Sequence, residues 1–381
     1  MINKKPKIAF IVTSVLIVHF FLDSHLKKLS KDYEITLIVK NDFPELIKNL
    51  NIANEIKFIN IERKLNIFKD LAALVHLLIY LRGKNFALVH SFGTKAGLLG
   101  MLASLFYFVP NRIYTYQGEV WINKKGIWRE ILRTVDKIIG LCCTNILVVS
   151  FSELNFLIDN KIINSKKATV LGNGSISGVD LVKFSPNLEI RKVEREKRGY
   201  KDSDIVFLYL GRINYEKGIH ELISAYKLLE RHNLNIKLLL VGPLDGISEV
   251  ELSLLISKNS NIQYEKFTDC PQNMFRCSDI LVLPSHREGF GVVVIEAAAV
   301  GIPTIGSRIY GISDSLIENH TGLMFDMGDH YDLYLTMLRL VNDSSLRTKL
   351  GNSARTRVIN NFDSEYVLSE IKQFYDALKL K

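Results

Sequence analysis

Short apolar runs alternate with longer amphipathic segments along the whole chain. In the first half the runs are continuous in Ile, Val and Leu, which is typical of parallel strands that are buried on both faces. Amphipathic segments such as 67–81 and 95–108 separate the runs and predict helices. The predicted strands are 7–13, 33–39, 56–61, 86–91, 111–117 and 145–150. The pattern predicts a doubly wound α/β domain.

The same pattern restarts after a polar, glycine-rich stretch. Residues 173–186 end in Pro186, and the charged stretch 189–201 follows, so we expect a domain boundary here. The chain of 381 residues is long enough for two cores. The predicted strands beyond the boundary are 205–211, 236–242, 262–267, 279–285 and 303–307. We therefore predict a first domain over residues 1–186, a second doubly wound domain over 187–362, and a helix over 363–381 that packs back toward the first domain.

The net charge of +9 is concentrated in the first part of the chain. Up to Ser185 there are 25 Lys and Arg against 14 Asp and Glu, and the totals of 49 and 40 leave 24 against 26 for the rest. We expect the first domain to bind a negatively charged partner, namely lipid head groups, pyrophosphate or nucleic acid. A solvated basic surface would explain the same asymmetry.

Apolar runs and cysteine spacing indicate where in the cell we expect the protein. No apolar run reaches the roughly 18 residues that span a bilayer. The apolar stretch 8–22 lacks a small-residue cleavage site, so we expect a first strand there and no signal peptide. The four cysteines form no CxxC pair, which fits a reducing cytoplasm.

A basic amphipathic segment lies at 121–141. We predict that it is one helix with an apolar face, bordered by positive charges. These are Lys124, Lys125, Arg129, Arg133 and Lys137. Such a helix suits an anionic bilayer surface. A core-packed helix with a solvated basic edge is the alternative.

Two acids mark a junction between a predicted strand and a helix. Glu288 lies in the loop after the apolar run that ends at Pro284, and Glu296 lies about one turn into the helix. Gly289 and Gly291 allow the backbone to approach a ligand, and the helix N-terminus offers N–H groups to an anion. The junction suits an anionic, hydroxyl-rich molecule. Two unrelated acids on the protein surface would produce the same sequence pattern.

The segment LGRINYEKG adds two cations near another strand end. Arg212 follows the strand and Lys217 stands where a helix begins, an arrangement that suits a diphosphate. An ordinary basic loop is the alternative. The DxD at 202–204 precedes the first strand of the second domain, so we read it as a solvated turn and expect no metal site there.

Together these motifs resemble the family 4 retaining glycosyltransferases, which have the GT-B fold. The matching segments follow the order and spacing of that family over the second half, and more loosely over the first half. They are HSFGTKAG, NRIYTYQG, NGSISGVDLVKFSP, GRINYEKG, DILVLPS, EGFGVVVIEAAAVGIPTI and ENHTGLMF. The resemblance implies two Rossmann-like domains that face a central cleft, with the acceptor bound by the first and a nucleotide sugar by the second.

The resemblance also implies roles for individual residues. Arg212 and Lys217 would bind the donor diphosphate and stabilise the charge of the leaving group. Glu288 would hold hydroxyls of the transferred sugar. The rest of the implied donor site is Glu296 for the ribose, Phe267 and Thr268 beside the base, the backbone of Gly289, Phe290, Gly291 and Val292, and His90 from the first domain.

The first domain departs from the pattern of the family at one position. Gln117 stands where the family often has a histidine, and an amide cannot act as a base. Two interpretations stay open: Gln117 only positions a substrate, or Glu119 supplies acid or base help nearby. The leaving phosphate itself is thought to act as the base in such enzymes, so the change need not abolish activity.

The resemblance predicts a bacterial enzyme at the inner face of the plasma membrane. It would move a hexose or N-acetylhexosamine, with retention, from a nucleoside-diphosphate sugar, expected to be UDP-linked, to a saccharide on polyprenyl diphosphate, in capsule, O-antigen or protein-glycan synthesis. No cofactor is expected. A nucleotide-sugar epimerase and a non-catalytic sugar-nucleotide or lipid-binding partner are the alternatives. The sequence shows no recognised nucleic-acid-binding module, so we do not expect nucleic-acid binding.

Overall fold

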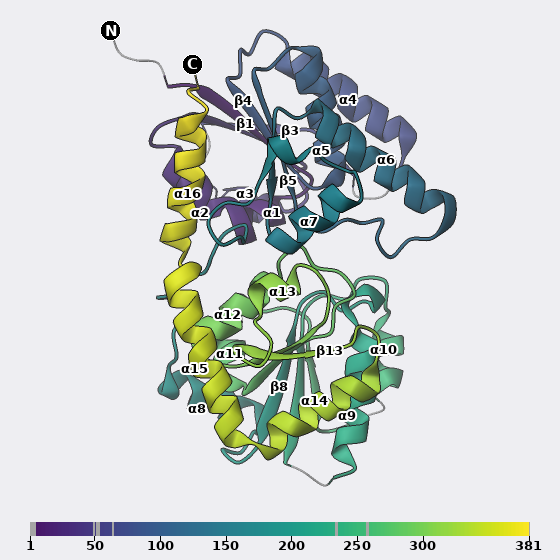
Figure 1. The fold of residues 1–381 in the computed structure, drawn as a ribbon, viewed down its shortest axis with the longest axis vertical. Coiled ribbons are helices and arrows are strands. Elements are labelled where there is room, and N and C mark those ends of the chain that lie inside the picture. The colour runs from purple at the N-terminus through teal and green to yellow at the C-terminus, as the bar shows by residue number, and fades with distance from the viewer. Residues whose placement is uncertain are drawn as a thin grey trace. The chain divides into compact units, whose positions relative to one another are not determined.

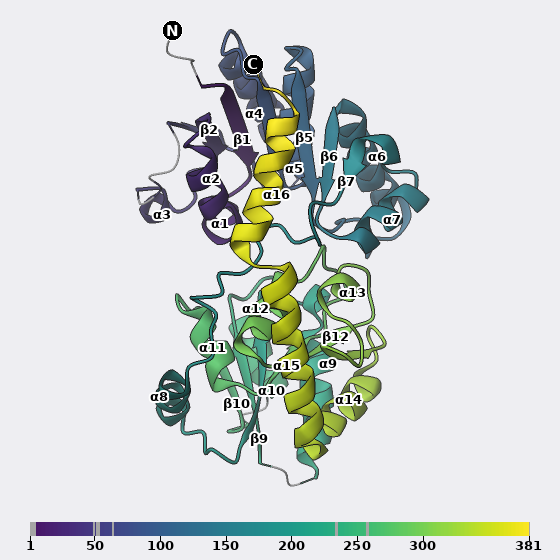
Figure 2. The ribbon, with the colours of Figure 1, turned by 60° about the vertical axis from the view of Figure 1, so that its left-hand side comes forward.

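The chain folds into two compact units, each built on one parallel sheet. The computed structural model describes residues 5–48, 50, 54–62, 65–232, 235–256 and 259–380. One unit comprises Met1–Ser177 with Glu365–Lys381, and the other comprises Gly178–Ser364 (Figures 1 and 2). The division therefore falls before the expected boundary at residue 186. The last helix, α16 (Ser364–Ala377), belongs with the first unit from Glu365 onward.

The sheet of the first unit has the order β3-β2-β1-β4-β5-β6-β7, and all neighbouring strands run parallel. The order reverses between β1 and β4, which is the arrangement of a doubly wound sheet. The strands are β1 (Lys7–Val12), β2 (Glu34–Val39), β3 (Glu55–Phe58), β4 (Leu88–Phe92), β5 (Asn111–Tyr116), β6 (Asn145–Val148) and β7 (Ala168–Thr169).

Helices cover both faces of this sheet, which explains why its strands are apolar on both sides. On one face α4 (Ile67–Leu81) and α6 (Gly126–Cys142) pack against α5 (Thr94–Phe106), which lies between them (Figure 1). α2 (Asp23–Leu29) and α16 lie on the other face (Figure 2). The remaining helical segments are α1 (Val15–Ile17), a π-helical turn η1 (Val18–Leu22), α3 (Pro44–Lys48), α7 (Phe151–Asp159) and a 3-10 turn η2 (Ser165–Lys167).

The sheet of the second unit has the order β10-β9-β8-β11-β12-β13, again with parallel neighbours. Its strands are β8 (Ile205–Leu210), β9 (Ile236–Val241), β10 (Ile262–Glu265), β11 (Ile280–Leu283), β12 (Thr304–Ser307) and β13 (Gly322–Phe325). The helical segments are α8 (Leu188–Arg198), a 3-10 turn η3 (Tyr215–Lys217), α9 (Ile219–Glu230), α10 (Glu249–Ile256), α11 (Pro271–Cys277), α12 (Val292–Val300), α13 (Ile312–Ser315), α14 (His330–Asn342) and α15 (Ser344–Asn361). The prediction of two α/β domains with doubly wound sheets is confirmed.

One predicted helix starts later than expected. The segment 121–141 was expected to be helical throughout, but α6 begins at Gly126, whose φ is +60°. Trp121 lies in the preceding loop and is fully buried, because its ring packs against Phe156 of α7. Within the described residues, no helix is both long enough and apolar enough to cross a bilayer.

Candidate active site

The loops that follow β8 and β11 meet in the second unit. These strands are parallel neighbours, so their carboxyl ends lie at the same edge of the sheet. Lys217, at the end of η3, places its Nζ 2.5 Å from Glu288 Oε1 in the loop after β11. Ser285 Oγ donates to the same oxygen at 2.8 Å. Both charged side chains are mostly buried, at 19% and 16% exposure. The two predicted loops therefore face each other.

Further contacts join these two loops, and sequence reasoning missed them. The His286 backbone N–H donates to the Glu216 carbonyl at 2.9 Å, and His286 Nε2 lies 2.9 Å from Glu221 Oε1. The hydrogen bond to Glu221 raises the pKa of His286. Arg287 Nη2 lies 3.3 Å from Glu216 Oε2. The acids at 216 and 221 and the cations at 286 and 287 were a signal of this pairing.

Two glycines are required for the loops to come this close. A Cβ at Gly218, where φ is +70°, would lie 2.0 Å from the Pro284 carbonyl oxygen. A Cβ at Gly311, where φ is +81°, would lie 2.5 Å from the Glu288 carbonyl oxygen. A side chain at Gly218 would push the two loops apart, and a side chain at Gly311, in the loop after β12, would displace the Glu288 loop.

Arg212 is held by an acid that the sequence analysis did not single out. It forms an ion pair with Asp245 in the loop after β9. Tyr209 donates to the Arg212 carbonyl at 2.5 Å, which fixes the backbone at the strand end. The Arg212 and Asp245 side chains are 38% and 44% exposed. A diphosphate would therefore compete with Asp245 for the guanidinium.

The N-terminus of α12 lies directly behind Glu288. Gly291, with φ of +74°, precedes the helix and provides no side-chain cap. Two of the predicted backbone donors, Gly291 and Val292, lie at this N-terminus, where N–H groups can bind an anion, and Gly289 precedes them. The Phe290 side chain is 3% exposed and packs against Phe362, so only its backbone fits the predicted role.

The other predicted donor residues lie around this edge. Glu296 is half-buried in α12, and burial raises its pKa to about 7, against the opposing charge of Lys183. Phe267 is 58% exposed and Thr268 follows it, both in the loop after β10. In the sheet, β10 is separated from β8 by β9. This spacing suits an elongated ligand that lies across the strand ends.

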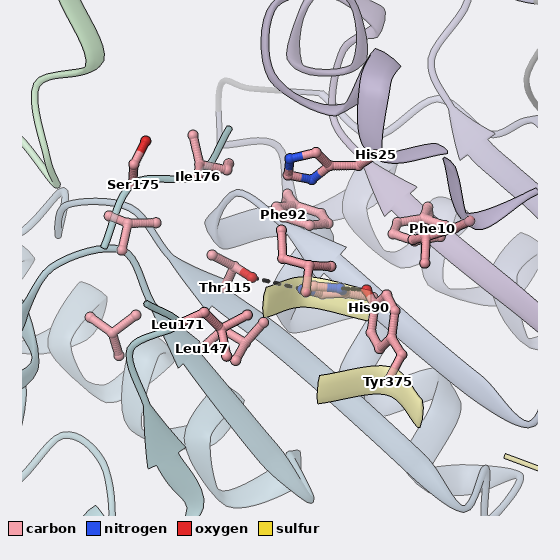
Figure 3. Close-up of a pocket in the computed structure, with 14 residues that line it drawn as sticks. Phe10, His25, His90, Phe92, Thr115, Leu147, Leu171, Ser175, Ile176 and Tyr375 are labelled. Carbon is pink, nitrogen blue, oxygen red and sulfur yellow. Dashed lines mark hydrogen bonds between the residues drawn. The ribbon is translucent and has the colours of Figure 1, made fainter. Parts of the chain in front are cut away.

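His90 lies at a small cavity of the first unit (Figure 3). Its Nδ1 lies 2.5 Å from the Tyr375 hydroxyl of α16, and its Nε2 lies 2.7 Å from Thr115 Oγ1. Burial lowers the pKa of His90 to about 3, so the ring is neutral. The cavity volume of about 30 Å³ holds one or two waters and no sugar nucleotide. The donor-binding role of His90 stays a prediction, since both ring nitrogens are engaged here.

The Gln117 side chain begins at the end of β5. Its Nε2 is buried and has no hydrogen-bond partner among the described residues, which leaves a donor for a bound molecule. Glu119, the alternative acid or base, is 2% exposed and lies near Glu153, whose pKa it raises. Gln117 therefore keeps a side-chain donor for a bound molecule, whereas the Glu119 carboxyl lies buried near another acid.

The predicted membrane cations fall into two groups. Lys124 and Lys125 are exposed and Lys137 is partly exposed. The guanidinium carbons of Arg129 and Arg133 lie 5.4 and 6.0 Å from the centre of the Trp121 ring, and Arg133 also donates to the Asn160 carbonyl at 2.7 Å. These two arginines therefore serve the packing of the fold as well as its charge.

Two helices on this face of the first unit expose apolar side chains. On α4 the exposed stripe, spaced by three or four residues, is Phe68, Leu71, Val75 and Ile79. On α6 it is Ile127, Ile131, Ile138 and Leu141. Scattered exposed apolar residues are normal, but two such stripes, on helices that both pack against α5, are a candidate interaction surface. We call these eight residues the apolar face.

Comparisons with known proteins agree with this geometry. The family described as glycosyl transferases group 1 matches residues 190–357. CapM, a capsular polysaccharide biosynthesis glycosyltransferase of Staphylococcus aureus, is 32% identical over 354 residues, which are 92% of this chain and 91% of CapM. A UDP-Gal:alpha-D-GlcNAc-diphosphoundecaprenol alpha-1,3-galactosyltransferase of Escherichia coli is 26% identical over 354 residues, with 91% and 89% covered.

A solved structure extends the likeness to the whole fold. Sucrose-phosphate synthase from Thermosynechococcus elongatus superposes with a TM-score of 0.83 at 20% sequence identity, over 98% of this chain and 99% of that one. Its two-sheet architecture is the one described above. Identity to CapM along nearly the whole chain, with the family match across the second unit, shows that this protein belongs to the group 1 glycosyltransferases and has the GT-B fold.

Proposed function

We propose that the protein transfers a hexose or N-acetylhexosamine, with retention of configuration, from a UDP-sugar to a saccharide on polyprenyl diphosphate. The observation that carries this proposal is the contact of Lys217 Nζ with Glu288 Oε1 beside the uncapped N-terminus of α12. A cation, a carboxylate and the N-terminus of a helix at one sheet edge fit a sugar diphosphate. The E. coli relative acts on a diphosphoundecaprenol acceptor, as its name states.

In this proposal the second unit stabilises the leaving diphosphate. Lys217 and Arg212 supply positive charge where negative charge develops as the glycosidic bond breaks. The N–H groups of α12 add to it. Glu288 accepts hydrogen bonds from hydroxyls of the sugar, and its contact with Lys217 holds both groups in place before the donor arrives. Glu296 accepts from the ribose hydroxyls when it is ionised.

The proposal also includes reversible attachment to an anionic membrane at the inner face of the bacterial plasma membrane. A polyprenyl carrier keeps its acceptor at the bilayer surface. The apolar face of α4 and α6 offers side chains that insert, and Lys124 and Lys125 offer charge for anionic head groups. A second copy of the chain fits this surface less well, because the same cations would then face each other.

The test combines the protein with UDP-sugars and GlcNAc-diphosphoundecaprenol as the acceptor. We expect release of UDP and a product whose new linkage has the anomeric configuration of the donor, which proton NMR reads directly. A UDP-sugar whose configuration changes without acceptor would identify an epimerase. Binding of a UDP-sugar, seen as a thermal shift, without turnover on any lipid-linked acceptor would identify a binding partner.

A further inference from the structure

The position of Gln117 depends on the turn that follows β5. Gly118 has φ of +92°, so the chain turns sharply there, and the loop continues to Lys125 before α6 begins. Glu119, the next residue, is 2% exposed. Since Gln117 Nε2 has no partner in the described part of the chain, its own side chain does not anchor it. Whatever fixes Gly118 and Glu119 therefore sets the direction of Gln117.

Glu153 is the residue that holds this turn. It lies in the first turn of α7, directly after β6, which is the neighbour of β5. Its side chain is fully buried, and its Oε1 accepts a hydrogen bond from the Gly118 backbone N–H. Its other carboxyl oxygen, Oε2, is buried and has no hydrogen-bond partner among the described residues. Glu153 thus holds the Gly118 backbone next to a second buried acid, Glu119.

A buried carboxylate oxygen without a hydrogen-bond partner is costly, so such an acid favours its protonated form. Two neighbouring ionised carboxylates would also repel each other inside the protein. Burial raises the pKa of Glu153 well above its usual range, and the nearby Glu119 raises it further. The pair therefore keeps one proton at a pH where an exposed glutamic acid has lost it.

The other titratable groups around the pair also favour the protonated form. On α6, burial raises the pKa of Asp136 to about 7, and the Trp121 Nε1–H donates to Asp136 Oδ2 at 2.8 Å. On β5, burial raises the pKa of Tyr114 and of Tyr116 well above the usual range, so both hydroxyls are neutral. Of the nearby cations, Lys124 and Lys125 lie exposed in the loop itself, and Arg129 and Arg133 lie over the Trp121 ring.

We propose that Glu153 is a positioning residue, and that its proton-sharing pair with Glu119 holds Gly118 and thereby Gln117 in place at the site. Loss of the shared proton to solvent leaves two repelling carboxylates, which releases the turn and lowers turnover at alkaline pH. The link to turnover rests on the proposed function, because it takes Gln117 as part of the active site. The coupling of the proton to the loop rests on the first unit alone.

Two substitutions separate the proton from the packing. Glu153→Gln keeps an acceptor for the Gly118 N–H and gives a permanent donor to Glu119, so it mimics the protonated acid. We expect it to keep the kcat of the parent at neutral pH and to lose the alkaline decline. Glu153→Ala removes both contacts, and we expect kcat to fall roughly tenfold to a hundredfold while KM for the donor stays within about twofold. Asp159→Asn, at an exposed acid of the same helix, is the control and should keep the pH profile of the parent.

Fluorescence tests the loop independently of sugar transfer. The chain has two tryptophans, so Trp128→Phe leaves Trp121, in the loop itself, as the sole reporter. In this background we expect the Trp121 emission to shift further to longer wavelength with rising pH than it does when Glu153→Gln is added, because the titration of Asp136, which accepts from Trp121, is common to both proteins. The proposal is overturned if Glu153→Gln follows the parent in both pH profiles, or if Glu153→Ala keeps full kcat. If the parent transfers no sugar, the proposed function fails. The pH dependence of the Trp121 emission still tests whether the proton on the Glu153–Glu119 pair controls the loop.

Discussion

Arg212 at the end of β8 is paired with Asp245 at the end of β9, in the unit that matches the glycosyltransferase family. The pair holds the guanidinium at the carboxyl edge of the sheet before any ligand is bound. Asp245 therefore has two opposing effects on a diphosphate donor. It orients its cationic ligand, and it competes with the donor for that cation.

Removal of the charge at Asp245 is expected to tighten nucleotide binding. Asp245→Asn keeps an acceptor for Arg212 but no longer competes as an anion. Because both side chains are more than a third exposed, the pair is worth about 1 kcal/mol at most, so the Kd for UDP should fall by no more than about fivefold. Calorimetric titration with UDP measures the change. An increase in Kd would show that orientation of Arg212 outweighs competition.

The buried carboxyl of Glu296 predicts a pH-dependent stability. Burial raises its folded-state pKa to about 7 from an ordinary value of 4.5. The stability that it contributes is present below the ordinary pKa and is lost as pH rises through about 7. The Tm of the parent minus that of Glu296→Gln should therefore fall between pH 4.5 and about 7 and then level off. A difference that stays constant across this range would place the carboxyl in solvent.

Exposed lysines before α6 are expected to set the charge dependence of membrane binding. Each lysine near an anionic surface contributes about 1 kcal/mol, so Lys124→Gln with Lys125→Gln should weaken binding to phosphatidylglycerol vesicles by roughly thirtyfold. Sedimentation with vesicles measures this. Arg129 and Arg133 are left unchanged, because their contacts with Trp121 would confound the result. Equal sedimentation of variant and parent would sink the electrostatic part of the proposal.

The α4 stripe is expected to supply the apolar part of membrane binding. Phe68 and Ile79 are 87% and 68% exposed, so Phe68→Ser with Ile79→Ser should leave folding intact. Loss of two inserted side chains should weaken vesicle binding at least about 100-fold, since each buries apolar area worth about 1.5–3 kcal/mol. Val182→Ser, at an 87% exposed position of the second unit, is the matched control. A loss shown equally by the control would argue against a specific face.

Local patterns in the sequence were enough to predict both sheets and part of the site. The continuous apolar runs placed β1 and β8, and the glycine-rich loops placed Lys217 and Glu288 at neighbouring strand ends. Such features depend on residues close in sequence and on the general geometry of parallel sheets.

Contacts between loops from different strands were not predictable in the same way. Asp245 lies 33 residues from Arg212, in a loop whose amino-acid sequence indicates only a turn. Glu153 belongs to an ordinary amphipathic segment, and only the folded chain shows that it is fully buried beside Gly118. Trp121 was assigned to the predicted helix because its spacing fits one, yet its packing against Phe156 keeps it in the loop.

The central claim is that Lys217 and Glu288 together bind the sugar diphosphate. The most direct test is kcat/KM for sugar transfer by Lys217→Ala and by Glu288→Ala, with Lys192→Ala at an exposed lysine of the same unit as the control. Loss of a group that stabilises the leaving charge costs about 100-fold to 1,000-fold, so we expect Lys217→Ala to lose at least about 100-fold. Glu288→Ala loses the contacts with the sugar hydroxyls and the partner that holds Lys217, so we expect a loss of the same order, while the control should match the parent. Turnover by either variant within a few-fold of the parent would contradict the account.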